Sequence, residues 1–204
     1  CPSTPIITDC HDLLIPLILD GKKPNQRRLN IEKISHSKSD AVIYVSDELE
    51  RLARAEYKYK GPSLTLPCLN AHEFVPRATA RNTHKLSQDD GHIHVVYQGS
   101  IVGAGANFHS KYMVDIFKKL VDNEIHVYCY AKTRNNLSIY KKLNRKYFHM
   151  VEPVDPVTLS RELRKYDYAI NIFNEDLEES VLLKGAFANK FSDAICAGLP
   201  VICD

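Results

Sequence analysis

The sequence lacks the features of a membrane-spanning protein or of one that coats nucleic acid. Its longest apolar run, Leu13–Leu19, contains Pro16 and is far shorter than the ~20 residues that a membrane-spanning helix needs. Charge of one sign is not in excess, because 27 Lys and Arg stand against 25 Asp and Glu, for a net charge of +2. No global field therefore draws the chain to nucleic acid, and we expect no nucleic-acid partner.

Cysteine patterns for metal binding are also missing. The six cysteines include no C-x-x-C pair, and no Cys/His cluster has the spacing of a zinc site, so we predict no metal site. We interpret the cysteines as small apolar side chains in a reduced core, which favours a reducing, cytoplasmic compartment. They are Cys1, Cys10, Cys68, Cys129, Cys196 and Cys203.

The composition is that of a globular protein. Apolar residues are 44% and charged residues 25% of the 204 positions, close to globular averages. This length corresponds to one large domain or two small ones. The chain begins Cys1-Pro2 without Met and ends just after a strand-like run, so we expect it to be part of a longer protein.

Apolar strand-like runs alternate with helical patterns along the chain. This alternation predicts an α/β protein with parallel sheets and right-handed crossovers. Residues 70–91 show no period and are rich in polar residues, so we interpret them as a linker. We expect strands at 5–8, 41–45, 64–69, 92–97, 126–131, 148–151, 168–173 and 200–203, and helices at 25–39, 46–60, 109–120, 137–146, 155–166 and 187–197.

A glycine-containing turn is expected directly after the first strand of the second half, over residues 98–105. Glycines such as Gly99 allow a backbone to approach a phosphate closely. The match to a nicotinamide-dinucleotide fingerprint is poor, because Phe108 stands where a small residue belongs and the next strand ends at Lys132 without an acid for a ribose. A plain surface turn and a loop facing a phosphate or a sugar remain open.

The segment 189–202 carries the most informative pattern. Lys190 and Asp193 are three positions apart and share one face of the predicted helix, while Phe191, Ala194 and Ile195 can pack inward. A Lys at the start of a helix and an Asp further in oppose the helix dipole, which suggests that the Lys serves an anion. A surface Lys–Asp pair is the alternative interpretation.

Residues 189–202 resemble the nucleotide-binding helix of glycosyltransferases with two Rossmann-like domains, the GT-B architecture of the group 1, family 4 type. Other segments resemble the same family in order: a strand ending in a histidine (5–12), an "Ala-Asp, apolar strand, Val-Ser-Glu" segment (40–49), an interdomain segment (67–76), and a first donor-domain strand with its glycine turn (95–100). The resemblance implies that 1–75 is the C-terminal part of an acceptor domain, 76–91 a linker and 92–204 the nucleotide-sugar domain.

The resemblance also implies an activity and roles. The chain would belong to a hexosyltransferase-like enzyme of polysaccharide or glycoconjugate biosynthesis, which moves a sugar from a nucleotide-diphosphate sugar to an acceptor hydroxyl, with retention and without a metal or other cofactor. Asn189 and Lys190 would meet the diphosphate, Asp193 the ribose, and Gly99 and Ser100 the phosphate side. His11 would lie near the sugar or the acceptor hydroxyl, as a catalytic residue; a structural histidine is the alternative.

The sequence departs from the family pattern at two positions. Ser100 follows Gly99 where many relatives have Arg, and the nearest cation is Lys111. Gly185 stands where many relatives have Glu, eight residues before the ribose carboxylate. These departures keep a non-catalytic nucleotide- or sugar-binding α/β module open as an alternative. A nicotinamide-dependent oxidoreductase is a weaker alternative, disfavoured by Phe108 and Lys132.

Two segments are strongly basic. Residues 22–38 hold six Lys or Arg and one acidic residue. Residues 132–146 hold six Lys or Arg and no acidic residue. We interpret them as solvated faces; the alternative is contact with anionic lipid, since family members often act on lipid-linked acceptors. The expected partners are a nucleotide sugar and a carbohydrate or lipid-linked acceptor, with peripheral contact at the inner face of a membrane as an option.

Overall fold

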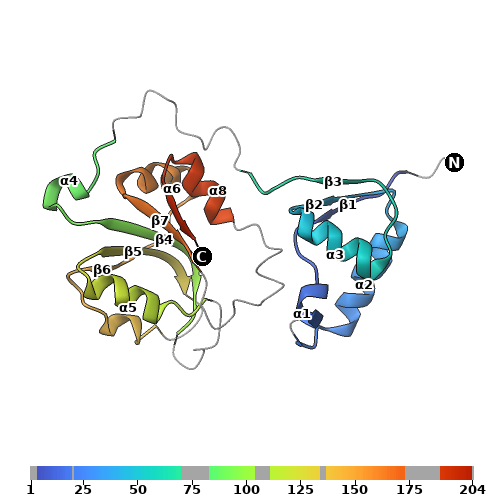
Figure 1. The fold of residues 1–204 in the computed structure, drawn as a ribbon, viewed down its shortest axis with the longest axis horizontal. Helices are drawn as coiled ribbons and strands as arrows, with labels where there is room; N and C mark the ends of the chain where they lie inside the picture. The colour runs from blue at the N-terminus through green and yellow to red at the C-terminus, as the bar shows by residue number, and fades with distance from the viewer. Residues whose placement is uncertain are drawn as a thin grey trace. The chain divides into compact units, whose positions relative to one another are not determined.

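The computed structural model of the chain describes residues 4–19, 21–69, 83–103, 111–133, 137–172 and 189–203. These residues form two compact units, one ending at Cys68 and the other beginning at Leu69. Each unit is built on a parallel sheet, with helices between most successive strands (Figure 1). The expected boundaries at 75 and 76 lie in a part of the chain outside the described ranges, so they stay predictions.

The first unit has a three-stranded sheet in the order β1-β2-β3, with every pair parallel. Val42 and Tyr44 point to one face of the sheet, where they are fully buried against helix residues such as Leu49 and Leu52. Figure 1 shows the helices of this unit on one side of its strands. The elements are β1 (Ile7–Cys10), α1 (Ile15–Leu19), α2 (Gln26–Lys38), β2 (Ala41–Tyr44), α3 (Asp47–Tyr57) and β3 (Ser63–Thr65).

The helix signals of this unit are confirmed at their N-termini. Ser46 caps α3, because its Oγ accepts the backbone N–H of Leu49 at 3.3 Å. Asn25 caps α2 in the same way through the backbone N–H of Arg28, at 3.1 Å. The first strand begins and ends two residues later than the predicted range of 5–8. Asp9 and Cys10 therefore belong to β1.

The second unit has a five-stranded sheet in the order β6-β5-β4-β7-β8, again with every pair parallel. The chain moves outward from β4 through β5 to β6, then returns to the other side of β4 and continues through β7 to β8. The topological switch point therefore lies between β4 and β7. The strands are β4 (His94–Ile101), β5 (His126–Thr133), β6 (Phe148–Val151), β7 (Tyr168–Asn171) and β8 (Val201–Cys203).

Helices cover both faces of this sheet. Val95 and Tyr97 of β4 pack on one face with Phe117 of α5, whereas Val96 packs on the other face with Leu163 and Ala194. Figure 1 shows α5 on one side of the strands and α6 and α8 on the other. The helices are α4 (Ser87–Asp90), α5 (Val114–Asp122), α6 (Pro156–Glu162) and α8 (Asn189–Cys196), with 3-10 turns η3 (Tyr140–Lys142) and η4 (Leu163–Lys165).

Several local predictions for the second unit are wrong. Residues 98–101 continue strand β4 instead of forming a turn, because they pair in register with β5 as far as Ile101. The helix predicted at 137–146 is only the 3-10 turn η3 among the described residues. Its buried Tyr140 donates its hydroxyl hydrogen to the backbone carbonyl of Val102, at 2.9 Å, and so serves the core rather than an amphipathic helix.

Three further predictions are corrected by burial and by hydrogen bonds. Ile195 is 55% exposed, so on α8 the inward side is carried by Ala194, which is fully buried. The described cysteines are all free; Cys10 and Cys129 are buried as expected, but Cys203 is exposed. In the predicted linker, α4 forms and is held to the second unit, since Ser87 Oγ donates to Asp167 at 2.6 Å.

Candidate nucleotide-sugar site

A cavity of about 300 Å³ opens at the carboxyl end of β4 in the second unit. Five of the six predicted site residues line it: Gly99 and Ser100 from β4, and Asn189, Lys190 and Asp193 from α8. The cavity lies beside the switch point of the sheet, where open α/β sheets bind their ligands. The remaining lining residues, which the sequence analysis did not select, are Gln98, Tyr130, Pro153, Val154 and Leu159.

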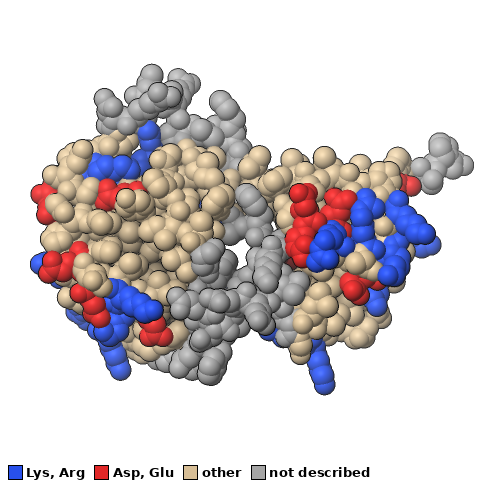
Figure 2. Space-filling model, viewed as in Figure 1, with Lys and Arg blue, Asp and Glu red and all other residues tan. Residues whose placement is uncertain are grey.

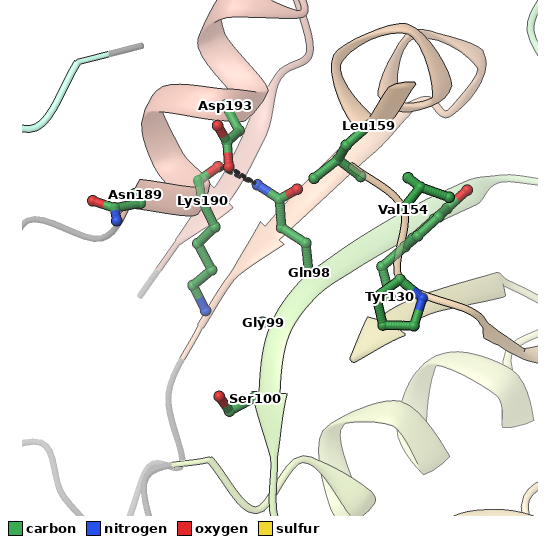
Figure 3. A pocket seen from close by; sticks show the side chains of 10 residues that line it. Gln98, Gly99, Ser100, Tyr130, Val154, Leu159, Asn189, Lys190 and Asp193 are labelled. Atoms are coloured by element: carbon green, nitrogen blue, oxygen red, sulfur yellow. Dashed lines mark hydrogen bonds between the residues drawn. The ribbon is translucent and has the colours of Figure 1, made fainter. Parts of the chain in front are cut away.

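Helix α8 presents its first turn to this cavity. Asn189 and Lys190 are its first two described residues, and both line the cavity. The Lys190 Nζ lies over the ring of Tyr97, 4.7 Å from the ring centroid. In Figure 3 the Lys190 side chain extends toward Gly99 and Ser100, which places a positive charge beside the backbone of β4.

Gln98 joins the two elements that form the cavity. Its Nε2 donates to Asp193 Oδ2 at 2.8 Å and to the backbone carbonyl of Lys190 at 3.1 Å (Figure 3). The Gln98 side chain is buried, and its Oε1 has no hydrogen-bond partner among the described residues. The amide therefore orients the Asp193 carboxylate and carries a buried acceptor that has no partner within the described ranges.

Gly99 is required by the backbone at this point. Its φ is +131°, a conformation that side chains on L residues rarely adopt. The adjacent Tyr97 hydroxyl donates to the backbone carbonyl of Ser100 at 2.9 Å, which holds the end of the strand. Burial raises the pKa of Tyr97, so this hydroxyl stays protonated and remains a donor.

The opposite wall of the cavity is apolar and anchored. Tyr130 is buried, and its hydroxyl contacts the Tyr166 hydroxyl at 2.8 Å and Glu162 Oε2 at 3.2 Å. Burial raises the pKa of Tyr130, so the neutral hydroxyl holds the ring in place. In Figure 3, Tyr130 and Val154 face the side of the cavity opposite Lys190. The arrangement offers a charged side and a flat apolar side within one cavity.

His11 belongs to the first unit, where it directly follows β1. Its Nε2 lies 3.1 Å from Asp9 Oδ2, and its Nδ1 lies 3.4 Å from Cys68 Sγ. The side chains of His11 and Asp9 are each 60% exposed. The ring is thus held on both nitrogens and accessible to solvent. Its catalytic role stays a prediction. Phe108, Gly185 and the segment 173–188 lie outside the described residues.

The comparisons with known proteins bear on the fold. No protein-family model and no curated protein sequence matches the chain. Its structure is similar to sucrose-phosphate synthase from Thermosynechococcus elongatus, with a TM-score of 0.69 and 14% identity, covering 97% of this chain and 49% of that one. The chain thus spans about half the length of that protein.

Two other solved structures are less similar to the chain. One is α,α-trehalose 6-phosphate synthase from Burkholderia multivorans, with a TM-score of 0.47 and 11% identity, covering 97% of this chain and 63% of that one. The other is a glycosylation-associated protein complex, Gap123, from Streptococcus agalactiae, with a TM-score of 0.43 and 13% identity, covering 98% of this chain and 37% of that one. The similarity to sucrose-phosphate synthase and the two parallel sheets together establish the fold. The chain has the two Rossmann-like α/β sheets of the GT-B type.

Proposed function

We propose that the chain is part of a glycosyltransferase that moves a hexose from a nucleotide-diphosphate sugar to an acceptor hydroxyl. The observation that carries this proposal is the cavity at the end of β4, where Gly99, Lys190 and Asp193 meet. These residues come from two segments about 90 positions apart. Their convergence at the switch point, beside the start of α8, is what a nucleotide diphosphate requires.

In this proposal the diphosphate binds between the start of α8 and the end of β4. Lys190 supplies a mobile cation, and the N–H groups of the first turn of α8 supply hydrogen-bond donors. Gly99 allows the phosphate to approach the backbone, since no Cβ stands there. Ser100 adds a hydroxyl donor to the same side of the cavity.

The nucleoside occupies the rest of the cavity. The Asp193 carboxylate, oriented by Gln98, accepts hydrogen bonds from the ribose hydroxyls. The apolar side formed by Pro153, Val154 and Leu159 suits the flat face of a base. An acid for the ribose at one end and an apolar surface at the other distinguish a nucleotide from a free phosphate.

The transfer breaks the bond between the anomeric carbon and the diphosphate oxygen and forms a bond from the acceptor oxygen to that carbon. The acceptor proton leaves with the diphosphate. Positive charge from Lys190 and from the first turn of α8 stabilises the departing diphosphate by electrostatics, which is why we propose a metal-independent reaction. Retention of configuration and a role for His11 beside the acceptor hydroxyl are further parts of the proposal.

A non-catalytic nucleotide-binding module is the second candidate. The low positive charge of the cavity favours this module, because Lys190 is the one cation among the described residues that line it. A diphosphate carries more negative charge than one Lys balances, and a leaving group needs more compensation than a bound ligand does. The two candidates differ only in turnover, so the tests below separate binding from catalysis.

The binding test is thermal unfolding of the chain with uridine, guanosine or adenosine diphosphate, with their hexose conjugates, or with NAD. A ligand present at 100 times its Kd adds about 2.7 kcal/mol to the free energy of unfolding. We expect stabilisation by one nucleotide sugar and none by NAD. Lys190→Ala should remove most of that gain, whereas Lys118→Ala, on an exposed part of α5, should keep it.

Equal stabilisation of wild type and Lys190→Ala would overturn the site. Turnover is tested on the complete gene product, by release of free nucleoside diphosphate in the presence of candidate acceptors. Release supports the transferase, while tight binding without release supports the module. Release by Lys190→Ala at the wild-type rate would contradict the proposed role of fixed charge.

We also propose contact with an anionic or lipid-linked acceptor through the basic segments. Figure 2 shows Lys and Arg gathered over α2 in the first unit. In the second unit, Lys141 and Arg145 line an apolar hollow with Tyr140 and Phe148. Among the described helices, none combines the length and the apolar character needed to cross a membrane. Flotation with anionic vesicles, compared with neutral ones, tests this contact.

A further inference from the structure

A cluster of histidines and one carboxylate lies at the amino-terminal edge of the second sheet. Asp90, His94 and His126 each offer one ligand atom, and these atoms all lie within 4.8 Å of one another. His94 Nε2 is 3.1 Å from Asp90 Oδ1, and His126 Nε2 is 3.5 Å from Asp90 Oδ2. His94 is buried, His126 is largely buried and Asp90 is exposed, so the cluster is open to solvent on one side.

The fold brings the three residues together. His94 and His126 are paired positions in the parallel register of β4 and β5, so their side chains project from the same face. Their rings are stacked with centroids 4.4 Å apart. Helix α4 ends at Asp90, just before β4, and the backbone N–H of His92 donates to Asp90 Oδ1 at 2.9 Å. The carboxylate is therefore held toward the two rings.

The donor set suits a particular class of ion. Two imidazoles and a carboxylate are ligands that zinc takes in three-residue sites, with water as the fourth ligand. Ligand atoms on one tetrahedral zinc ion lie about 3.3 Å apart, given metal–nitrogen distances of about 2.0–2.1 Å. The Asp90 oxygens lie close to that spacing from the two rings, at 3.1 Å for Oδ1 to His94 and 3.5 Å for Oδ2 to His126, and the three ligand atoms all lie within 4.8 Å of one another.

The outer contacts also match a metal site. A ligating histidine usually has its other ring nitrogen held by a neighbouring group, which fixes the ring orientation. His126 meets this condition, since its Nδ1 lies 2.9 Å from His149 Nε2. His149 stacks in turn on the ring of Tyr128, with centroids 4.3 Å apart. The ring of His126 is thus oriented from behind while its Nε2 faces Asp90.

We propose that Asp90, His94 and His126 form a binding site for a divalent transition-metal ion of the zinc type, which ties α4 to β4 and β5. The ion would be bound by His94 Nε2 and the Asp90 carboxylate in place of their direct contact, in which Nε2 lies 3.1 Å from Oδ1. The open side of Asp90 leaves room for water as the fourth ligand.

Two features of the cluster lower the expected affinity for the metal ion. The imidazole planes are only 3° apart, so the rings must tilt for both lone pairs to point at one ion. His94 Nδ1 is buried and has no partner among the described residues, and it must carry a hydrogen once Nε2 holds the metal. We therefore expect micromolar binding, weaker than that of structural zinc sites in zinc-finger peptides.

This site is separate from the nucleotide cavity. His94 begins β4, whereas Gln98 and Gly99 line the cavity at the other end of the strand. Four residues of extended strand separate His94 from Gln98 by about 13 Å. The bound ion would brace the sheet and would not touch the sugar donor, so this inference does not depend on the proposed function.

A second combination of similar residues does not converge in this way. His11 contacts Asp9 through Nε2 but Cys68 through Nδ1, on opposite sides of its ring. One ion cannot bind both nitrogens of the same imidazole. The zinc-type site is thus assigned to the cluster around Asp90 and not to the histidine of the first unit.

The test is calorimetric titration of the metal-free full chain with Zn²⁺, repeated with Mg²⁺. We expect one Zn²⁺ bound through the cluster, a raised unfolding temperature, and no binding of Mg²⁺, which prefers oxygen ligands. Asp90→Asn and His126→Gln should each weaken this binding at least tenfold. Asp89→Asn is the matched control: it removes an exposed charge from the neighbouring position on α4 and should bind Zn²⁺ like the wild type.

Unfolding temperatures without metal show whether each variant is folded. Because Asp90 is exposed, Asp90→Asn keeps the test valid even if His126→Gln unfolds. Absence of Zn²⁺ binding by the wild type would overturn the proposal, as would wild-type affinity in Asp90→Asn. Equal weakening by Asp89→Asn would also overturn it, because it would show attraction to surface charge only.

Discussion

The side-chain amide of Gln98 donates a hydrogen bond to the carboxylate of Asp193 at 2.8 Å. The same nitrogen donates to the backbone carbonyl of Lys190, so one buried side chain connects the central strand β4 to the first turn of α8. A neutral amide can orient a carboxylate without neutralising it. Asp193 is thereby held in one orientation at the edge of the cavity.

Replacing Gln98 tests this connection. Gln98→Leu keeps the volume but removes the donor, so the free energy of unfolding should fall by about 1–3 kcal/mol through loss of a charge-assisted bond. Affinity for a nucleotide ligand should fall as well, because Asp193 loses its orientation. Urea unfolding and ligand titration measure the two effects. A variant with unchanged stability and affinity would show that the amide is not needed.

Gly99 should not tolerate a side chain. Because its φ is +131°, Gly99→Ala should destabilise the second unit by about 1–3 kcal/mol through backbone strain. Ser100→Ala, at the next position, is the matched control and should change the free energy of unfolding by no more than about 0.5 kcal/mol. Thermal unfolding of both variants checks the prediction; equal stability of the two would contradict it.

Glu50 should make the first unit sensitive to acid. Hydrogen bonds from Ser63 and Arg54, at 2.7 Å and 2.8 Å, lower the pKa of Glu50 from its ordinary value of 4.5. A carboxyl whose pKa is lower in the folded state stabilises the fold above its unfolded pKa and loses that contribution as the pH falls through the folded pKa. Stability should therefore decline below about pH 4.5, and less steeply in Glu50→Gln.

Urea unfolding across this pH range measures the effect. Glu56→Gln, which changes an exposed carboxylate on the same helix, serves as the control and should keep the wild-type pH dependence. If Glu50→Gln showed the same slope as the wild type, the contacts of Glu50 with Ser63 and Arg54 would not be the source of the acid sensitivity.

Ser46 should contribute to stability as a helix cap. Its Oγ satisfies the backbone N–H of Leu49 at the start of α3, so Ser46→Ala should cost about 1 kcal/mol and Ser46→Asp much less. Chemical denaturation of the two variants gives the difference directly. Equal losses for Ala and Asp would mean that Ser46 acts through other contacts and not as a cap.

Local signals in the sequence were enough for the order of the elements and for several helix ends. Ser46 and Asn25 cap helices at the predicted helix starts, and Pro156 is the first residue of α6. Strand β6 matches its predicted range of 148–151. These features depend on residues close in the chain, where capping geometry and apolar alternation act without help from distant segments.

Other features could not be predicted locally. Residues 98–101 contain a glycine and were expected to form a turn, but pairing with β5 extends the strand through them. The basic segment around Tyr140 has a helical pattern, yet a core hydrogen bond from its hydroxyl to Val102 accompanies a 3-10 turn instead. In both cases tertiary contacts outweighed local preference.

The sequence by itself determined the α/β class and the parallel character of the sheets, because these follow from local patterns. Helical spacing and a glycine after a strand also selected Lys190, Asp193 and Gly99, while the family resemblance selected Asn189 and Ser100, and all five line one cavity. Only the tertiary structure decided that Gln98 supports Asp193 and that His94 meets His126 beside Asp90. Gln98 and Asp193 are far apart in the chain, and so are His94 and His126. The register of parallel strands and the crossover that returns α8 to β4 bring them together, and no local spacing encodes either.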